Sequence, residues 1–388
     1  MGVYAAPGVY VEEVPAAAPI VGVGTSTPAF IGVWPDPAVI DPALAKPGDV
    51  VAITSITAFK AAFGDFTAAA PVNNGLNTLG HAVRGFFENG GTMCYVSRAL
   101  TEGDIGTVVL AKLEAYDDIA MVAAPGVPAV QAQMGAVTAI VAHCTLMGDR
   151  IAILDAPQNA TDPKDLAPLL PGGTAPIYNA TDFAAIYTPW VVVFDDATRA
   201  EKVVPPSGHI AGIYARVDAT RGVHKAPANE QILGVIRPSL RIGKAQQASV
   251  NLLGGNCIRN LNGALKVWGA RTLAGEASLH KYVPIRRLLS FLYKSIDHGT
   301  QWAVFEPNGP DLWARVIRNV SAFLTDVWSQ GALAGATAAE AFYVKVDAEN
   351  NPPSQRANGL LVAEVGVATV FPAEFVVFRI QQFTGPIK

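Results

Sequence analysis

Aspartates that directly follow apolar runs are the residues of this sequence best placed to form an active site. Asp155 follows the run at 151–154, and Asp195 and Asp196 follow the run at 190–194. Open α/β sheets often place their active sites where strands end. Aspartates also cap and turn chains, which is the simpler interpretation of all three. We therefore predict structural roles for them and no active site.

Sequence motifs for other chemistry are missing. The chain has no G-x-S-x-G, H-E-x-x-H or C-x-x-C pattern. Gly243-Lys244 is followed by Ala245, and Pro238 stands where a phosphate-binding loop needs its first glycine. Gly22 and Gly24 match the first two glycines of the dinucleotide fingerprint, but Thr27 stands where its third glycine is required. We expect no cofactor.

Neither the histidines nor the paired arginines form a recognisable site. Metal-binding histidines recur at short, regular spacings. Arg286-Arg287 is typical of a solvated or interface helix face. We expect no metal site from the six scattered histidines, His81, His143, His209, His224, His280 and His298.

Composition favours a self-associating protein and argues against nucleic-acid-binding and membrane-spanning classes. Of 388 residues, 51% are hydrophobic and only 15% charged, which suits a chain that buries surface against other copies of itself. The net charge of -4 without a long basic run argues against nucleic acid as a partner. No apolar stretch reaches the length of a membrane span. Three separated cysteines and the lack of a signal-peptide pattern at residues 1–6 predict synthesis in a reducing cytoplasm.

The first 40 residues are predicted to form an extended arm and one core strand. Residues 7–15 are a β-prone run bounded by prolines, and the prolines and glycines that follow leave it without a local hairpin partner. Residues 29–33 are predicted as a core strand. The prolines between 35 and 47 mark a loop or a domain crossing.

Residues 50–200 alternate between helical and strand patterns. Ser55 can cap a helix that runs to Phe63. A helical stripe over 76–87 ends at Gly90-Gly91, and a second helix is compatible with 134–147. Strands are predicted at 93–96, 119–123, 151–154 and 190–194, the last reached from 183–187. This alternation predicts a mainly parallel α/β sheet.

The remaining part contains two amphipathic helices and several strands. Apolar residues recur at helical spacing over 285–296 and over 312–327, and Pro310 stands where a first-turn proline is tolerated. Strands are predicted at 342–346, 361–370 and 375–380.

Several ordered motifs resemble the tail sheath family of contractile bacteriophages and extracellular contractile injection systems. They cover the first 35 residues and roughly 240–388, whereas the middle segment is less diagnostic. The motifs are residues 7–14 (PGVYVEEV), 25–32 (TSTPAFIG), 267–273 (VWGARTL), 282–287 (YVPIRR), 299–308 (GTQWAVFEPN), 347–351 (DAENN) and 372–378 (PAEFVVF).

The resemblance implies a mixed α/β core made from both chain ends, an inserted α/β domain, and β-strand arms. The implied core comprises 26–50 and 230–371, and the inserted outer domain comprises 51–229. The arms would be 1–25 and 372–388, each adding a strand to a neighbouring subunit's sheet. The residues implied in these arm contacts are Val9, Tyr10, Val11, Glu12, Val14, Phe375, Val377, Phe378 and Ile380.

The resemblance also implies a function and its partners. A sheath subunit would polymerise around an inner tube protein and contract from a metastable state, without nucleotide. Baseplate and terminator proteins would bind the sheath, with no direct nucleic-acid contact and no membrane insertion. The implied particle is assembled in a bacterial cytoplasm as a phage tail or a tail-like particle. The candidate tube-facing residues are Gly331, Leu333, Thr337 and Glu340.

Two other functions remain as alternatives. An α/β enzyme using Asp155 and Asp195 would form a discrete oligomer and lose turnover when these residues are changed to asparagine. A capsid or baseplate component would form closed shells or plates instead of tubes.

Overall fold

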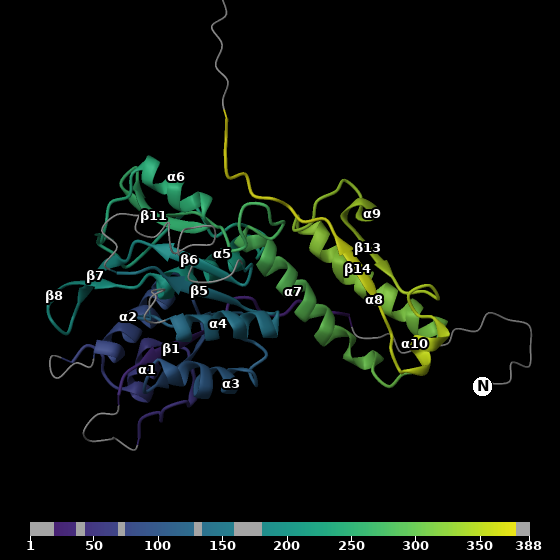
Figure 1. Ribbon diagram of the computed structural model, residues 1–388, viewed down its shortest axis with the longest axis horizontal. Helices are drawn as coiled ribbons and strands as arrows, with labels where there is room; N and C mark the ends of the chain where they lie inside the picture. Colours follow the sequence, from purple (N-terminus) through teal and green to yellow (C-terminus); the bar gives the residue numbers. More distant parts are fainter. Residues whose placement is uncertain (1–18, 36–42, 69–73, 128–133, 159–180, 378–388) are drawn as a thin grey trace, which may run out of the picture. The chain divides into compact units, whose positions relative to one another are not determined.

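The computed structural model describes residues 19–35, 43–68, 74–127, 134–158 and 181–377. These residues form two compact units (Figure 1). The α/β unit comprises Val23–Lys294 and the described residues from Thr369 onward, and the helical unit comprises Ser295–Ala368 with residues 19–22. These boundaries differ from the predicted ones at 50, 229 and 371. Strands from both predicted segments belong to one sheet in the α/β unit.

The α/β unit is built on a nine-stranded sheet whose central part is parallel. The neighbours β3, β1, β4, β5, β6 and β11 are all parallel, and antiparallel strands complete both edges. The predicted mainly parallel sheet is therefore confirmed. In spatial order the strands are β2 (Val50–Ile53), β3 (Cys94–Ala99), β1 (Pro28–Val33), β4 (Met121–Ala123), β5 (Ile151–Asp155), β6 (Ala184–Thr188), β11 (Gly255–Leu261), β12 (Ala264–Trp268) and β9 (Glu230–Gln231).

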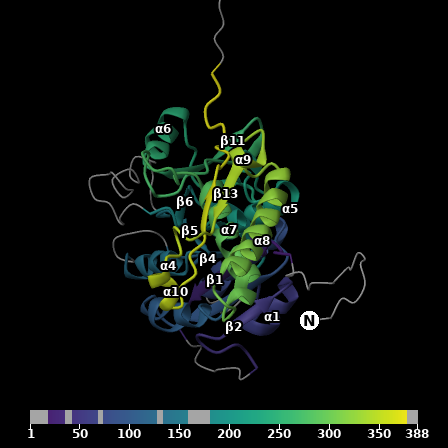
Figure 2. The same cartoon turned by 90° about the vertical axis from the view of Figure 1, so that its right-hand side faces the viewer.

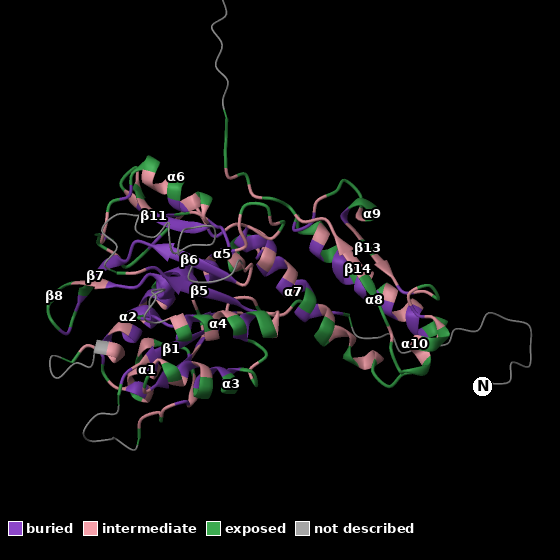
Figure 3. Cartoon of the chain, viewed as in Figure 1, coloured by how far each residue is buried: buried purple, intermediate pink, exposed green. Residues whose placement is uncertain are grey.

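Helices cover both faces of this sheet, so its central strands are buried (Figure 3). Phe30 and Ile31 are neighbours in β1, and because strand side chains alternate they enter different cores. The first core includes α1 (Ile56–Phe63), α2 (Asn74–Glu88) and α5 (Ser207–Arg221). The second includes the π-helical η1 (Ile105–Val109), α3 (Leu110–Leu113), α4 (Met134–Met147) and α6 (Lys244–Leu252).

Local signals placed several of these elements correctly. The Ser55 hydroxyl accepts a hydrogen bond from the Ala58 backbone N–H at 3.1 Å, which caps α1 as predicted. The predicted helix at 134–147 is confirmed as α4. The prediction for 190–194 needs correction, because β6 instead continues the parallel sheet. Only Pro189 and Trp190 separate β6 from the next strand, and a parallel neighbour needs a crossover of a dozen or more residues.

A separate three-stranded antiparallel sheet therefore contains that next strand. It consists of β10 (Arg237–Pro238), β7 (Val191–Asp195) and β8 (Ala200–Val204). The sequence also gave no signal for α5, since this helix is buried on nearly all sides and lacks an amphipathic stripe. Gly208 and Gly212 let α5 approach the α2 backbone. A Cβ atom at Gly208 would lie 2.2 Å from the Ala82 carbonyl oxygen.

The helical unit consists of two long helices and a small sheet. The end of α7 (Val283–Thr300) leads through the 3-10 helix η5 (Gln301–Ala303) to α8 (Pro310–Ser329). The short α9 (Ala338–Ala341), β13 (Phe342–Lys345), α10 (Pro353–Ala357) and β14 (Glu364–Val367) follow. The two antiparallel strands lie beside α8 (Figures 1 and 2).

Most predicted elements of this part are present. The two helices are confirmed, and the strand predicted at 342–346 is β13. The strand predicted at 361–370 is shorter, because only Glu364–Val367 pairs with β13. Residues 375–377 have no regular structure, and 378–380 lie outside the described residues. No described helix is both long and apolar enough to cross a membrane.

Candidate functional site

The chain passes between its two units at three points: after Gly22, after Lys294 and after Ala368. Close to each point, a residue on the α/β side takes part in a contact with buried charged groups. These residues are Thr25, Lys294 and Glu374. We consider the three contacts together as the candidate site, because they fix where each segment leaves the α/β unit.

The first contact holds Thr25 between α5 and α7. Arg287 of α7 donates two hydrogen bonds to the Asp218 carboxylate of α5, at 2.9 and 2.6 Å, and a third to the Thr25 carbonyl oxygen at 2.9 Å. The Thr25 hydroxyl donates to the same carboxylate at 2.6 Å. Both charged side chains are only 4% exposed. Such a buried two-pronged pair fixes geometry as well as charge.

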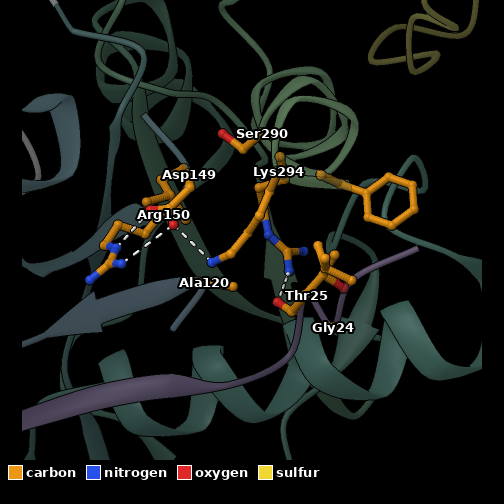
Figure 4. A pocket seen from close by; sticks show the side chains of 11 residues that line it. Gly24, Thr25, Ala120, Asp149, Arg150, Ser290 and Lys294 are labelled. Atoms are coloured by element: carbon orange, nitrogen blue, oxygen red, sulfur yellow. Dashed lines mark hydrogen bonds and ion pairs between the residues drawn. The ribbon is translucent and has the colours of Figure 1, made fainter. Parts of the chain in front are cut away.

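The second contact holds α7 where it leaves the unit (Figure 4). The Lys294 ammonium lies 2.8 Å from the Asp149 carboxylate, which also accepts a hydrogen bond from Arg150 at 2.7 Å. Burial alone would raise the pKa of Asp149, but hydrogen bonds from Arg150 and Lys294 lower it below its ordinary value. One turn earlier, Ser290 donates to the Gly148 carbonyl oxygen.

A small cavity of about 20 Å³ lies between these first two contacts (Figure 4). Its lining includes Thr25, Asp149, Arg287 and Lys294. A cavity of this size has room for about one water molecule and is too small for an organic ligand. The cavity is therefore a small gap beside the two contacts and not a site for such a ligand.

The third contact holds the C-terminal segment. Arg271 is bound to Glu374 through two hydrogen bonds, Nε to Oε1 at 2.8 Å and Nη2 to Oε2 at 2.7 Å. Asn251 and Tyr282 also donate to this carboxylate, each at 2.8 Å. Burial would raise the pKa of Glu374, but these hydrogen bonds lower it. The outer side of Arg271 binds the more exposed Glu276.

Beyond Glu374 the chain presents apolar side chains to solvent. Phe375 is 72% exposed and Val377 is 78% exposed. Of the predicted arm residues, only these two lie within the described structure. Val9, Tyr10, Val11, Glu12, Val14, Phe378 and Ile380 lie outside it. At the other end, residues 19–25 are already held, because Ile20 is buried and packs beside Gly299.

The small sheet of the helical unit has an open edge. The Ala368 N–H donates to the Ala341 carbonyl oxygen at 2.8 Å. Because antiparallel ladders alternate, the backbone groups of Val365 and Val367 then point away from β13. In the described part of the chain, no third strand pairs with β14 on that side. This edge can accept an extended segment.

The candidate tube-facing residues lie between α8 and β13. Gly331, Thr337 and Glu340 are exposed, whereas Leu333 is 4% exposed and packs within the described chain. The Glu340 carboxylate accepts a hydrogen bond from the Ala336 N–H at 2.8 Å. The loop is closed by a hydrogen bond from the Trp328 ring N–H to the Gly335 carbonyl oxygen. Three of the four predicted residues are thus exposed in the braced segment that comprises this loop and α9.

The aspartates considered first have structural partners. Asp155 accepts hydrogen bonds from both the backbone N–H and the hydroxyl of Ser207, so it caps the start of α5 from a neighbouring strand. Asp195 accepts from the Ala197 N–H, in the turn after β7, and from Asn77. Asp196 pairs with Arg84. The predicted capping role is confirmed for Asp155 and the predicted turn role for Asp195.

The histidines likewise show no shared site. His81 lies 3.1 Å from Asp195, and burial lowers the pKa of its ring. Burial also lowers the pKa of His209 to about 4. Across the described residues, no group of three histidine, cysteine, aspartate or glutamate side chains could hold a metal ion.

Comparisons with known proteins give one consistent answer. Two family models match, the phage tail sheath protein central domain over residues 100–273 and the phage tail sheath C-terminal domain over 276–383. The structure of the anti-feeding prophage helical sheath in its contracted state is 31% identical to this chain. That match has a TM-score of 0.78 and covers 98% of this chain and 100% of the other. The chain belongs to the contractile tail sheath family.

Other relatives agree with this assignment. The contracted sheath of the extracellular contractile injection system PVC is 29% identical, with a TM-score of 0.78, and covers 98% of this chain and 99% of the other. The tail sheath protein of Burkholderia phage BcepMu is 30% identical over 55% of this chain. A putative prophage major tail sheath protein of Pseudomonas aeruginosa strain UCBPP-PA14 is 30% identical over 60%. The chain spans about half the length of these two curated relatives, 45% and 57%.

Membership in the sheath family confirms the resemblance and the mixed α/β fold inferred from the sequence. The contacts that hold this sheath chain at its crossings were not predicted. Arg271 and Glu374 do lie within two of the recognised motifs, 267–273 and 372–378. An arginine and a glutamate inside otherwise largely uncharged motifs were the available signal in the sequence. Asp149 and Asp218 carried no comparable signal.

Proposed function

We propose that this chain is a sheath subunit that polymerises around an inner tube and contracts to drive that tube through a target envelope. The whole-length likeness to contracted injection-system sheaths carries the proposal. A chain from the anti-feeding prophage baseplate structure, 29% identical over 98% of this chain, supports contact with a baseplate. The other proposed partners are copies of this chain, the tube protein and a terminator protein. Assembly takes place in a bacterial cytoplasm, as part of a phage tail or a tail-like particle.

The proposed connection between subunits is strand exchange. The predicted arms, 1–25 and 372–388, are shortened in this proposal to residues 1–18 and 375–388, because residues 19–25 and Glu374 contact the chain's own units. The open edge of β14 on a neighbouring copy receives such an arm and supplies the hydrogen bonds that its backbone needs.

The proposed mechanism needs no nucleotide. The subunits move as rigid bodies while the exchanged strands keep them connected, and the energy of contraction is stored during assembly. The three ion-paired crossings support this view, because they fix where the chain leaves the α/β unit. The proposed core and outer parts of the subunit remain 26–50 with 230–371, and 51–229. Gly331, Thr337 and Glu340 are the proposed tube-facing residues.

A substitution at the open edge tests the proposal. In Val365→Pro the lost N–H points away from β13, so the helical unit should fold normally while arm pairing fails. The matched control, Gly366→Pro, removes an N–H that faces β13 and should destabilise the sheet itself. Circular dichroism and electron microscopy separate folding from assembly. Normal sheaths from folded Val365→Pro protein would refute this acceptor edge.

Deletion of the N-terminal arm gives an independent test. Protein lacking residues 1–15 should remain a folded monomer and form no sheaths. Protein lacking only residues 1–6 keeps the β-prone run at 7–14 and should assemble. Sheaths of normal length from the longer deletion would rule out the role of this arm.

A further inference from the structure

A groove at the β12 end of the large sheet carries more positive charge than the described residues neutralise. It has a volume of about 790 Å³ and lies among α6, the ends of β11 and β12, and residues 370–375. We call it the basic groove. Four cationic side chains line it, against the single carboxylate of Glu374, which is bound to Arg271. The four are Arg221, Lys225, Lys244 and Arg259.

Three of these cations have no carboxylate partner among the described residues. Lys225 pairs with Glu230. Arg259 is held by the Gln247 side chain at 2.6 Å and by the Ile242 carbonyl oxygen at 3.1 Å, both neutral groups. Arg221 and Lys244 are exposed and form no ion pair within the described structure. Trp268, 38% exposed, adds apolar surface beside this charge.

A surface of opposite charge lies at the other end of the same sheet. Residues 102–118, which comprise η1, α3 and the short segments on either side of them, carry five carboxylates and one lysine. We call this segment the acidic ridge. Asp104 and Asp118 are occupied by Thr101 and Tyr95. Glu114 and Asp117 are exposed and form no ion pair with any described residue.

One subunit cannot bring these two surfaces together. The ridge packs near β3 and the groove near β11 and β12. Five strand spacings separate β3 from β11, or roughly 25 Å at ~4.8 Å each. Figure 1 shows α3 and α6 at opposite ends of the α/β unit. Any contact between the surfaces must therefore join two copies.

We propose that the basic groove of one subunit docks the acidic ridge of the next. Such a contact is heterologous, so it leaves a free groove at one end and a free ridge at the other and propagates. It rests on the proposed sheath function and adds to it an electrostatic contact between α/β units, distinct from strand exchange. Complementary charge sets the register of neighbours and rejects wrong ones.

Charge reversal tests the contact. Arg221→Glu with Lys244→Glu reverses the groove, and Glu114→Lys with Asp117→Lys reverses the ridge. Each double variant should lower the yield of sheaths about tenfold at physiological salt, since attraction becomes repulsion. The protein with all four changes should recover most of that yield. Arg199→Glu reverses an exposed charge in the turn between β7 and β8 and serves as the control.

The outcomes separate this contact from the function on which it rests. If the unaltered protein forms no sheaths, the proposed function fails, and the contact with it. If it forms sheaths and either double variant does so equally well, the contact alone is refuted. If the groove variant fails but the ridge variant assembles, something else fills the groove, with Glu12 and Glu13 of the N-terminal arm the next candidate. That result also overturns the proposal. Recovery in the fourfold variant, lost again above about 0.5 M salt, is the expected result.

Discussion

Arg271 and Glu374 are 103 positions apart in the chain, and their side chains form a two-pronged ion pair with a closest distance of 2.7 Å. Arg271 is 4% exposed, and Glu374 is the last described residue held before three exposed apolar ones. The pair therefore marks where the C-terminal segment stops being part of the α/β unit. It also explains why two separated sequence motifs contain charged residues.

Glu374→Gln should release the C-terminal segment while the α/β unit stays folded. The substitution removes the carboxylate charge of Glu374 that pairs with Arg271, but the ion pair between Arg271 and Glu276 remains. Amide hydrogens at 370–377 should exchange faster, and proteases should cut there sooner. Glu276→Gln is the matched control, since it removes the other carboxylate of the same arginine. Equal protection of the segment in both variants would contradict the anchoring role.

Asp218→Asn should destabilise the α/β unit far more than Glu374→Gln does. Arg287 would keep its charge at 4% exposure without a carboxylate partner. Breaking one side of a buried pair typically costs about 3–5 kcal/mol. Urea unfolding followed by circular dichroism gives the change. A double variant, Asp218→Leu with Arg287→Met, should regain much of the stability, because no buried charge is then left unpaired. A loss below about 1 kcal/mol in the single variant would show that the pair is dispensable.

Asp155→Asn should change how stability depends on pH. Burial raises the pKa of Asp155 to about 7, so between about pH 4 and 7 the folded protein holds a proton that the unfolded chain has lost. This carboxyl therefore lowers stability as pH rises through that window, by at most about 1.4 kcal/mol per unit. Asparagine can retain both contacts with Ser207 and does not titrate. The difference in unfolding free energy between the two proteins should favour the variant increasingly from pH 4 to 7. A constant difference would contradict the assigned shift.

Two glycine-to-alanine changes should differ in their effect on the melting temperature. At Gly208 an added Cβ atom would lie 2.2 Å from the Ala82 carbonyl oxygen, so the α2–α5 contact must open. At Gly135, in α4, nothing lies within 4 Å, and alanine favours the helix. Gly208→Ala should lower the melting temperature by several degrees, and Gly135→Ala should leave it unchanged or raise it. Similar melting temperatures for the two would refute the close approach of α5.

The sequence predictions were accurate for elements whose structure depends on residues close by in the chain. Ser55, the stripe of α8 and the apolar runs of β1, β4 and β5 act within a few residues, and these elements were placed correctly. Helix α5 depends on the α2 backbone and on the sheet, so its sequence shows no period. The strand at 190–194 was predicted as a strand, but the sheet to which it belongs was not. Its local pattern was correct, but its short connection to β6 decided its sheet.

The candidate site was less predictable than the fold. Its ion pairs join residues 69, 103 and 145 positions apart, and no local pattern links such partners. The family resemblance named Phe375 and Val377 as arm contacts, and both are exposed here, but their contacts with a neighbouring subunit stay a prediction. Leu333 was named as tube-facing through the same resemblance but is 4% exposed, because a resemblance identifies a segment without saying which of its side chains are buried.

Negative-stain electron microscopy of the purified protein, with no tube protein or nucleotide added, tests the central claim most directly. We expect hollow, ribbed tubes of open-ended length, since each copy both provides and accepts contacts. Uniform small particles, or closed shells and plates, would contradict a self-assembling sheath.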